Sequence, residues 1–203
     1  MNDRRVVLAT RSRRKLDELR QLLDQENVDL VSLADLGVIE EVPETGATFE
    51  ANARAKARSY ARLTGLPTLA DDSGLEVDAL GGGPGVRTRR FAGDHASDEE
   101  NNRTLLDVLA GLPPEQRGAR YVCVLALAEP TPAGMVVTTA RGTCRGRIAT
   151  EPRGVNGFGY DPIFEPAQEP PGGATFGLWP PERKRAISHR ARAARRMAAH
   201  LKA

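Results

Sequence analysis

Two adjacent carboxylates, Asp71 and Asp72, are the side chains of this sequence best suited to chemistry, and Ser73 and Gly74 follow them directly. The apolar residues 66–70 before them predict a short buried strand that ends where the carboxylates begin. Ligands bind at strand ends in α/β sheets, and buried neighbouring carboxylates need a compensating cation or hydrogen bonds. Mg²⁺ takes one or two protein carboxylates and fills its other positions with water and substrate phosphate. The segment therefore indicates metal-dependent chemistry on a phosphorylated substrate; the alternative is a simple turn, because Asp, Ser and Gly favour turns.

A basic loop follows the apolar run at residues 6–9, and leucines at helical spacing follow the loop. Backbone N–H groups at a helix N-terminus favour anions, and Lys15 would add a point charge there. The loop lacks the glycines of a Walker P-loop, so a phosphate cradle and an exposed basic turn are both open interpretations. The candidate phosphate-binding residues are Thr10, Arg11, Ser12, Arg13, Arg14 and Lys15.

Residues 157–162 form a second candidate site, a loop with two glycines and two aromatic residues. Glycines such as Gly159 allow unusual backbone angles and a close approach. Phe158 and Tyr160 offer faces for stacking, and Asp161 can accept hydrogen bonds from a base edge. The loop predicts a pocket for a purine nucleotide, and the alternative is an aromatic-capped turn.

Three polar residues near the C-terminus add possible donors: Lys184, His189 and Arg190. They stand at the beginning of a segment with helical periodicity that starts near Glu182. Each can donate to a phosphate or to a purine carbonyl. The alternative for His189 is a surface position in an arginine-rich helix.

Strands and helices must position these side chains, and the hydrophobic periodicity predicts both. Thr48 is a candidate N-cap for a helix in which Asn52 and Lys56 lie four residues apart and share one face. Ser97 and Glu100 form a capping-box pattern for another helix. The predicted strands are 6–9, 28–31, 66–70, 121–128 and 135–148, the last two as an antiparallel pair, and the predicted helices begin near residues 16, 49, 98 and 182.

Length and composition predict one globular domain over residues 1–203, with 40% hydrophobic and 28% charged residues. No apolar run approaches the roughly 20 residues that a membrane helix needs. Cys123 and Cys144 fall in predicted strands, and we expect buried reduced thiols. The net charge of +2 is modest, which argues against a stable nucleic-acid partner. Because Met1 and the residues after it show no signal-peptide pattern, we expect a cytoplasmic protein.

Taken together, the motifs resemble those of the inosine triphosphate pyrophosphatase family, in the same order and over nearly the whole chain. They are Ala9-Thr10 with Lys15, Glu44-Thr45-Gly46-x-Thr48-Phe49-x-x-Asn52-Ala53-x-x-Lys56-Ala57, Ala70-Asp71-Asp72-Ser73-Gly74-Leu75, Phe158-Gly159-Tyr160-Asp161-Pro162 and Ala186-Ile187-Ser188-His189-Arg190.

The resemblance implies the hydrolysis of ITP, dITP and XTP, which are deaminated purine nucleotides, to the monophosphate and pyrophosphate. It implies an α/β fold in which an elongated, long mixed β-sheet is flanked by helices, with two lobes and a central substrate groove. It also implies Mg²⁺ as cofactor and a homodimer. Two other functions stay open from the residues alone: a pyrophosphatase for other modified or pyrimidine nucleotides, and a non-catalytic nucleotide- or nucleic-acid-binding protein.

The resemblance also implies roles for individual residues. Glu44 and Asp72 would bind Mg²⁺, and Asp72 would be the base that activates water. Substrate would be bound by the loop from Thr10 to Lys15, by Lys56 and Ser73, by Phe158, Gly159, Tyr160 and Asp161, and by Lys184, His189 and Arg190. Asp71 would support the site through hydrogen bonds.

The chain departs from the family pattern in three places. The segment Thr175-Phe176-Gly177-Leu178 lacks the acid that the family usually has before a later lysine. Arg11 and Ser12 stand where the family usually has Gly and Asn before the lysine of the loop. Arg87 and Arg89 replace an aromatic and a small residue. Arg11, Arg13 and Arg14 could compensate in triphosphate binding.

Overall fold

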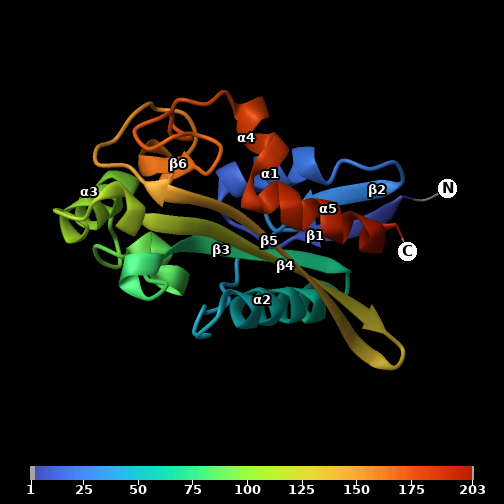
Figure 1. Cartoon of the computed structure of the whole chain (residues 1–203). Helices are drawn as coiled ribbons and strands as arrows, with labels where there is room; N and C mark the ends of the chain where they lie inside the picture. Colours follow the sequence, from blue (N-terminus) through green and yellow to red (C-terminus); the bar gives the residue numbers. More distant parts are fainter. Residues whose placement is uncertain (1–2, 203) are drawn as a thin grey trace. The chain divides into compact units, whose positions relative to one another are not determined.

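The computed structural model describes residues 3–202, so Met1, on which the signal-peptide expectation partly rests, lies outside the described residues. The strands are β1 (Arg4–Leu8), β2 (Val28–Ser32), β3 (Thr68–Val77), β4 (Gly118–Thr131), β5 (Gly134–Ile148) and β6 (Phe164–Pro166) (Figure 1). The helices are α1 (Arg13–Leu22), α2 (Phe49–Thr64), α3 (Asp98–Val108), α4 (Pro181–Ile187) and α5 (His189–Leu201), with short 3-10 turns that include Gly85–Arg90 and Asp161–Ile163.

The strands form one six-stranded sheet in the order β2-β1-β3-β4-β5-β6. β1 pairs in parallel with both β2 and β3, whereas β5 and β6 are antiparallel. β4 and β5 are neighbours joined by only two residues, and so short a connection allows only an antiparallel pair. The sheet is therefore mixed, and the predicted α/β class and antiparallel pair are confirmed.

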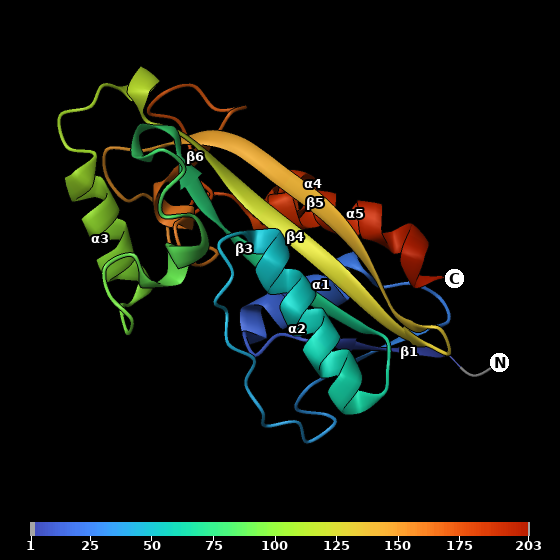
Figure 2. The same cartoon turned by 90° about the horizontal axis from the view of Figure 1, so that it is seen from below.

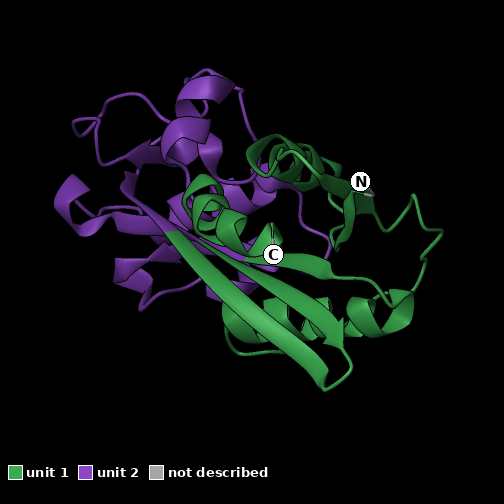
Figure 3. Cartoon of the chain, turned by 90° about the vertical axis from the view of Figure 1, so that its right-hand side faces the viewer, with its two compact units in different colours: residues 1–72, 123–142, 190–203 green, residues 73–122, 143–189 purple. Residues whose placement is uncertain are grey.

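The chain divides into two compact units, and β3, β4 and β5 each contribute to both (Figure 3). Unit 1 comprises residues 1–72, 123–142 and 190–203, and unit 2 comprises residues 73–122 and 143–189. The expectation of one domain over residues 1–203 stays a prediction.

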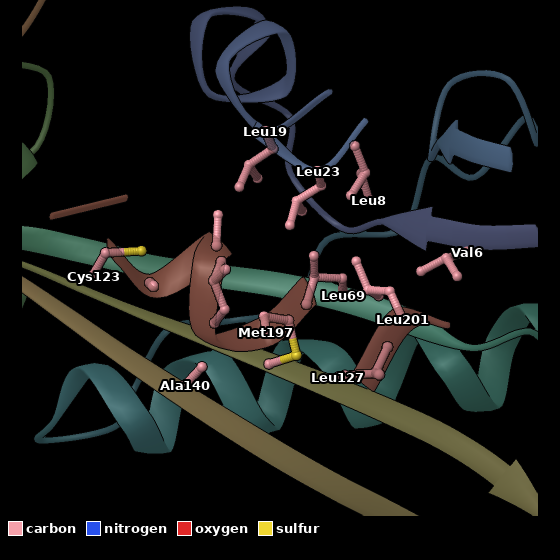
Figure 4. Packing of buried hydrophobic residues seen from close by; sticks show 13 residues of the cluster. Val6, Leu8, Leu19, Leu23, Leu69, Cys123, Leu127, Ala140, Met197 and Leu201 are labelled. Atoms are coloured by element: carbon pink, nitrogen blue, oxygen red, sulfur yellow. The ribbon is translucent and has the colours of Figure 1, made fainter. Parts of the chain in front are cut away.

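In unit 1, helices cover both faces of the sheet: α1 and α5 lie on one face and α2 on the other (Figures 1 and 2). Apolar side chains of α1 and α5 pack on alternate residues of the strands, because successive strand residues point to opposite faces. Figure 4 shows this core, which includes Leu8 of β1, Leu69 of β3, Leu19 of α1 and Met197 of α5. The other face of β3 is consequently left to α2.

Helix α2 forms as its sequence predicts. The Thr48 hydroxyl accepts a hydrogen bond from the Ala51 N–H at 3.1 Å and so satisfies one of the free donors of the first turn. The helix ends at Gly65, which adopts a left-handed φ of +70° that favours glycine. Asn52 and Lys56 lie on the buried face of α2, so the predicted shared face is confirmed.

Unit 2 has a second core, which is rich in aromatic residues. Tyr121, Phe164, Phe176 and Trp179 are buried in it together with leucines of α3. Helix α3 begins with the predicted capping box, in which Ser97 and Glu100 exchange hydrogen bonds. This core supports the loop at residues 157–162.

Two predictions about secondary structure are wrong. The strand predicted to end at Ala70 continues to Val77, so Asp71 and Asp72 lie inside β3 and are not part of a turn. Cations from other elements compensate both carboxylates, which lets the strand continue through them. The single C-terminal helix is two helices, because Ser188 has an extended backbone with ψ of 157° that interrupts the α-helix.

Cys123 and Cys144 are free and buried, as predicted. Within residues 3–202, no helix combines the length and the apolar character needed to cross a membrane.

Candidate active site

Asp71 and Asp72 point to opposite faces of β3, as neighbouring residues of a strand must. Both belong to unit 1 and both are buried. Asp71 meets cations of α1 and α5, whereas Asp72 meets polar side chains of α2. One strand thus presents two carboxylates to two different environments.

Two side chains of α2 contact the Asp72 carboxylate. The Asn52 amide donates to Asp72 Oδ2 at 3.0 Å, and Lys56 Nζ lies 3.8 Å from Asp72 Oδ1. Burial raises the pKa of Asp72 above its usual value, and the Lys56 ammonium and the Asn52 amide offset this only in part. A carboxylate with a raised pKa is a stronger base than an exposed one and suits proton abstraction from water.

Lys56 connects the groups around Asp72. Its ammonium donates to Glu44 Oε1 at 2.8 Å and to the Asp71 carbonyl oxygen at 2.5 Å. Burial alone would lower the pKa of Lys56, but the charges of Asp71, Asp72 and Glu44 outweigh burial and raise it. Lys56 therefore stays a cation between the two predicted metal ligands, Glu44 and Asp72.

Asp71 belongs to an ion network on the other face of the strand. Its Oδ2 lies 2.9 Å from Lys15 Nζ and 3.8 Å from Arg190 Nη2, and Arg190 also pairs with Glu18 of α1. Burial would raise the pKa of Asp71, but Lys15, Arg190 and Lys56 hold the pKa of this carboxyl well below its usual range. Asp71 is therefore a permanent anion that orients Lys15 and Arg190, as its predicted supporting role requires.

The donor set around Lys56 is compatible with Mg²⁺. Residues 3–202 contain no cluster of three His, Cys, Asp or Glu side chains that could bind a metal ion. Mg²⁺ does not require one, because it takes one or two carboxylates and keeps water and phosphate as its other ligands. Glu44 and Asp72 share the cation Lys56, so they already form an anionic pair of hard oxygen donors. These two residues fit the predicted metal site.

The basic loop at residues 10–15 begins α1. The Ser12 hydroxyl caps the helix by accepting from the Lys15 N–H at 3.4 Å. Arg11 lies outside this cap and donates to the carbonyl oxygen of Glu40 at 2.6 Å. Arg13 and Arg14 are exposed, and Thr10 accepts from the Ser12 N–H at 3.3 Å. Together with Lys15, these residues place positive charge at the N-terminus of a helix, the arrangement that favours anions.

In unit 2, the second candidate site centres on Asp161. Its carboxylate accepts from Lys184 Nζ and, at 2.9 Å, from the Phe158 N–H. The Lys184 ammonium also lies 5.0 Å from the centre of the Phe158 ring. At Gly157 a Cβ atom would come within 2.0 Å of Asp161 Oδ2, so only glycine fits there. The structure thus brings together three of the residues predicted to bind the base.

Tyr160, which belongs to this loop, and His189, the first residue of α5, are both buried. The Tyr160 hydroxyl donates to the Thr88 carbonyl oxygen at 2.8 Å, so Tyr160 supports the loop from inside the core. His189 stacks on the ring of Tyr121, which excludes the surface position given as its alternative. Phe158 and Ser73 are only half-buried. The substrate contacts of these residues stay predictions.

Helix α3 also contacts the loop at residues 157–162. Asp98 and Asn102 lie four residues apart and both contact the backbone of Gly159. Asp98 Oδ2 accepts from the Gly159 N–H at 2.8 Å, and the Asn102 amide donates to the Gly159 carbonyl oxygen at 3.1 Å. Gly159 has a left-handed φ of +63°, a conformation that these two contacts help to maintain. We call Asp98 and Asn102 the α3 clasp.

Sequence reasoning missed several residues that the structure places at the two clusters. Asn52 was recognised only as a neighbour of Lys56, although its amide group joins Asp72 to the Gly46 N–H. Its place in the motif around Lys56 is a signal that could have identified it. Tyr121 and the α3 clasp carry no local signal, because they lie far along the chain from the loop at residues 157–162.

Comparisons with known proteins show what the chain resembles as a whole. The model of the Ham1 family matches residues 6–200. A protein of Syntrophobacter fumaroxidans named dITP/XTP pyrophosphatase is 50% identical over 188 residues, which are 93% of this chain and 78% of that protein. A solved HAM1 protein from Coxiella burnetii is 38% identical, with a TM-score of 0.87 over 98% of both chains. A solved structure from Mycobacterium abscessus, titled nucleoside-triphosphatase and dITP/XTP pyrophosphatase, is 46% identical, with a TM-score of 0.76 over 98% of this chain and 100% of that one.

Proposed function

This chain belongs to the Ham1 family, and from that premise we propose that it hydrolyses the deaminated purine nucleotides dITP, ITP and XTP to the monophosphate and pyrophosphate. Relatives that are about half identical to it over most of its length are named dITP/XTP pyrophosphatase. The observation that carries the proposal is the environment of Asp72, a buried carboxylate with a raised pKa next to the Lys56 cation and Glu44. The resemblance found in the sequence leads to the same reaction.

Asp72 is the general base of the proposed reaction. It takes a proton from a water molecule whose oxygen attacks the α-phosphorus, and the bond from this phosphorus to the bridging oxygen of pyrophosphate breaks. The Asn52 amide fixes the orientation of Asp72 by donating to one of its oxygens. Asp72 Oδ1, which lies 3.8 Å from Lys56 Nζ, is the proposed proton acceptor.

The proposed cofactor is Mg²⁺, bound by Glu44 and Asp72. A bound Mg²⁺ ion neutralises charge that develops on the phosphate oxygens. Lys56 lies between the same two carboxylates and offers a second positive charge to phosphate. Lys15, the N-terminus of α1 and the arginines of its loop supply further positive charge for the triphosphate.

Selectivity for deaminated purines over adenine needs a donor that meets their 6-oxo group. Adenine carries an amino group at that position, so a buried donor there would lose its hydrogen bond. Lys184 and His189 are the candidate donors of unit 2, and Phe158 is the candidate surface for stacking with the base. Arg190 is proposed to act through Asp71 and Glu18, the carboxylates that it contacts.

One assay tests the reaction and its cofactor together. Pyrophosphate release is measured with dITP, ITP, XTP, GTP, ATP and pyrimidine nucleotides, with and without Mg²⁺. We expect turnover of dITP, ITP and XTP in the presence of Mg²⁺ and little turnover of ATP. Equal rates with ITP and ATP would contradict the selectivity, and full activity after chelation would contradict the cofactor.

A second measurement locates the metal independently of turnover. Mg²⁺ is titrated against the protein by calorimetry, and Glu44→Gln is compared with Glu50→Gln, an exposed glutamate in the first turn of α2. We expect Mg²⁺ affinity to fall by at least about tenfold in Glu44→Gln and to stay unchanged in Glu50→Gln. Loss of even a residue that only hydrogen-bonds a metal ligand typically costs that much affinity. We also propose a cytoplasmic homodimer, and light scattering of the purified chain tests the dimer.

A further inference from the structure

Tyr121 of β4 has no role in the proposed reaction, yet it contacts two of the residues proposed to recognise the base. Its hydroxyl donates to Asp161 Oδ1 at 3.3 Å. Its ring stacks on the ring of His189, with centroids 4.7 Å apart and planes only 9° from parallel. One side chain therefore touches both the loop at residues 157–162 and the start of α5.

The Tyr121 ring is well fixed. Only 7% of the residue is exposed, and it lies in the long strand β4. Phe164 packs against the ring at 4.6 Å between centroids, and Phe176 lies nearly parallel to it at 6.2 Å. Aromatic pairs at these separations add stability beyond the area that they bury. Tyr121 consequently offers a rigid ring face on which His189 stacks.

The Tyr121 hydroxyl donates to the Asp161 oxygen opposite the one that Lys184 contacts. Lys184 and the Phe158 N–H both donate to Oδ2, and Tyr121 donates to Oδ1. Burial and the nearby Asp161 charge raise the pKa of Tyr121 well above its usual value, so the phenol keeps its proton and stays a donor. A phenylalanine would fill the same space, but it would leave Asp161 Oδ1 without this donor.

We propose that Tyr121 is a positioning residue for base recognition: its ring sets the plane of His189, and its hydroxyl fixes the carboxylate of Asp161. The inference rests on the proposed function, because it assigns to Tyr121 the alignment of two residues of that same site. It predicts that Tyr121 acts on substrate binding and selectivity, while Asp72 and its neighbours act on turnover.

Two substitutions separate the two contacts. Tyr121→Phe keeps the stacking and removes the hydrogen bond to Asp161, so we expect KM for ITP to rise about three- to tenfold with kcat unchanged. Tyr121→Leu removes both contacts, and we expect a rise in KM of more than about tenfold with a lower preference for ITP over ATP. Trp179→Leu is the matched control, because Trp179 is buried in the same aromatic core and packs on Phe176. It should lower the melting temperature and leave KM unchanged.

NMR of the histidine rings gives a readout that general core packing does not move. The chain has three histidines, and His95 and His200 are exposed, so replacing each by glutamine assigns the His189 signal. Stacking on Tyr121 should shift that signal upfield in the wild type and in Tyr121→Phe. In Tyr121→Leu it should move towards the position of a free histidine.

The outcomes distinguish this inference from the proposed function. If the wild type hydrolyses ITP and Tyr121→Phe keeps its KM, or if Trp179→Leu raises KM as much as Tyr121→Leu does, the positioning role is wrong and the reaction stands. If the wild type hydrolyses no purine nucleotide, the proposed function fails and the inference fails with it. If Tyr121→Leu does not fold, Tyr121→Phe alone decides.

Discussion

Unit 1 and unit 2 each bury acidic side chains, but in different surroundings. In unit 1, Asp71 and Asp72 are surrounded by cations and amides that come from α1, α2 and α5. In unit 2, the pair of Asp161 and Lys184 is lined by aromatic rings. Charged surroundings suit reactions at phosphate, because they can balance charge that develops during the reaction. Aromatic surroundings suit recognition of a flat base.

The contrast also appears within unit 1, between neighbouring residues. Lys15 and Arg190 lower the pKa of Asp71, which makes it a fixed anion. The pKa of Asp72 is raised, chiefly by burial, which makes it able to accept a proton. Burial alone does not decide the role of a carboxylate. The surrounding charges decide it: Lys15, Arg190 and Lys56 act on Asp71, whereas Glu44 opposes Lys56 at Asp72.

Asp72→Asn tests the catalytic half of the comparison and carries the largest expected effect. We expect kcat for ITP to fall by about 10²–10⁴-fold, the usual contribution of a general base, with the fold preserved. Asp161→Asn, its counterpart in unit 2, should raise KM far more than it lowers kcat. Turnover close to wild type in Asp72→Asn would remove Asp72 from the role of base.

Asp71→Asn tests the structural role of Asp71 in unit 1. It leaves the buried Arg190 with Glu18 as its remaining carboxylate partner, so we expect the free energy of unfolding in urea to fall by about 3–5 kcal/mol, as when a buried ion pair loses one member. Asp35→Asn is the control, because its Arg20 partner and its own carboxylate are largely exposed. An equally small loss of stability in both variants would contradict the stabilising role of Asp71 in the buried ion network.

The same variant has a pH signature. The pKa of folded Asp71 lies below its usual value near 3.8, so its stabilising effect is full above that pH and is lost as the pH falls towards the folded pKa. Wild-type stability should therefore decline below about pH 4–5. In Asp71→Asn this part of the decline should be missing, and a difference between the two proteins that does not change with pH would count against the ion network.

The sequence predicts the parts of both clusters that depend on local spacing. Asn52 and Lys56 share a face because they are four residues apart in a helix, and Thr48 and Gly65 mark its ends. The continuation of β3 through Asp71 could not be predicted in this way. The cations that stabilise Asp71 come from Lys15 and Arg190, far away along the chain. Tyr121 likewise lies in an ordinary apolar strand sequence, and only its contacts with Asp161 and His189 indicate a positioning role.

The α3 clasp gives a further prediction, which concerns base recognition in unit 2. Asn102→Ala or Asp98→Ala removes one of the two contacts with the Gly159 backbone. We expect KM for ITP to rise about three- to tenfold with kcat nearly unchanged, because one hydrogen bond that orders the loop is lost. Glu99→Ala removes the same charge as Asp98→Ala from the same turn of α3 and should leave KM unchanged. A similar rise in KM in Glu99→Ala would assign the effect to helix charge.

Ser97→Ala carries the smallest expected effect and separates the clasp from the stability of its helix. The substitution removes the hydroxyl that caps α3, so the free energy of unfolding should fall by about 1 kcal/mol in a urea titration. The backbone of residues 98–102 stays helical in the folded protein, so Asp98 and Asn102 keep their contacts with Gly159 and KM should not change. If Ser97→Ala raises KM as much as Asn102→Ala does, a general loosening of α3 explains both results. If KM rises only when a clasp residue is changed, unit 2 recognises its ligand through side chains that hold one loop in place.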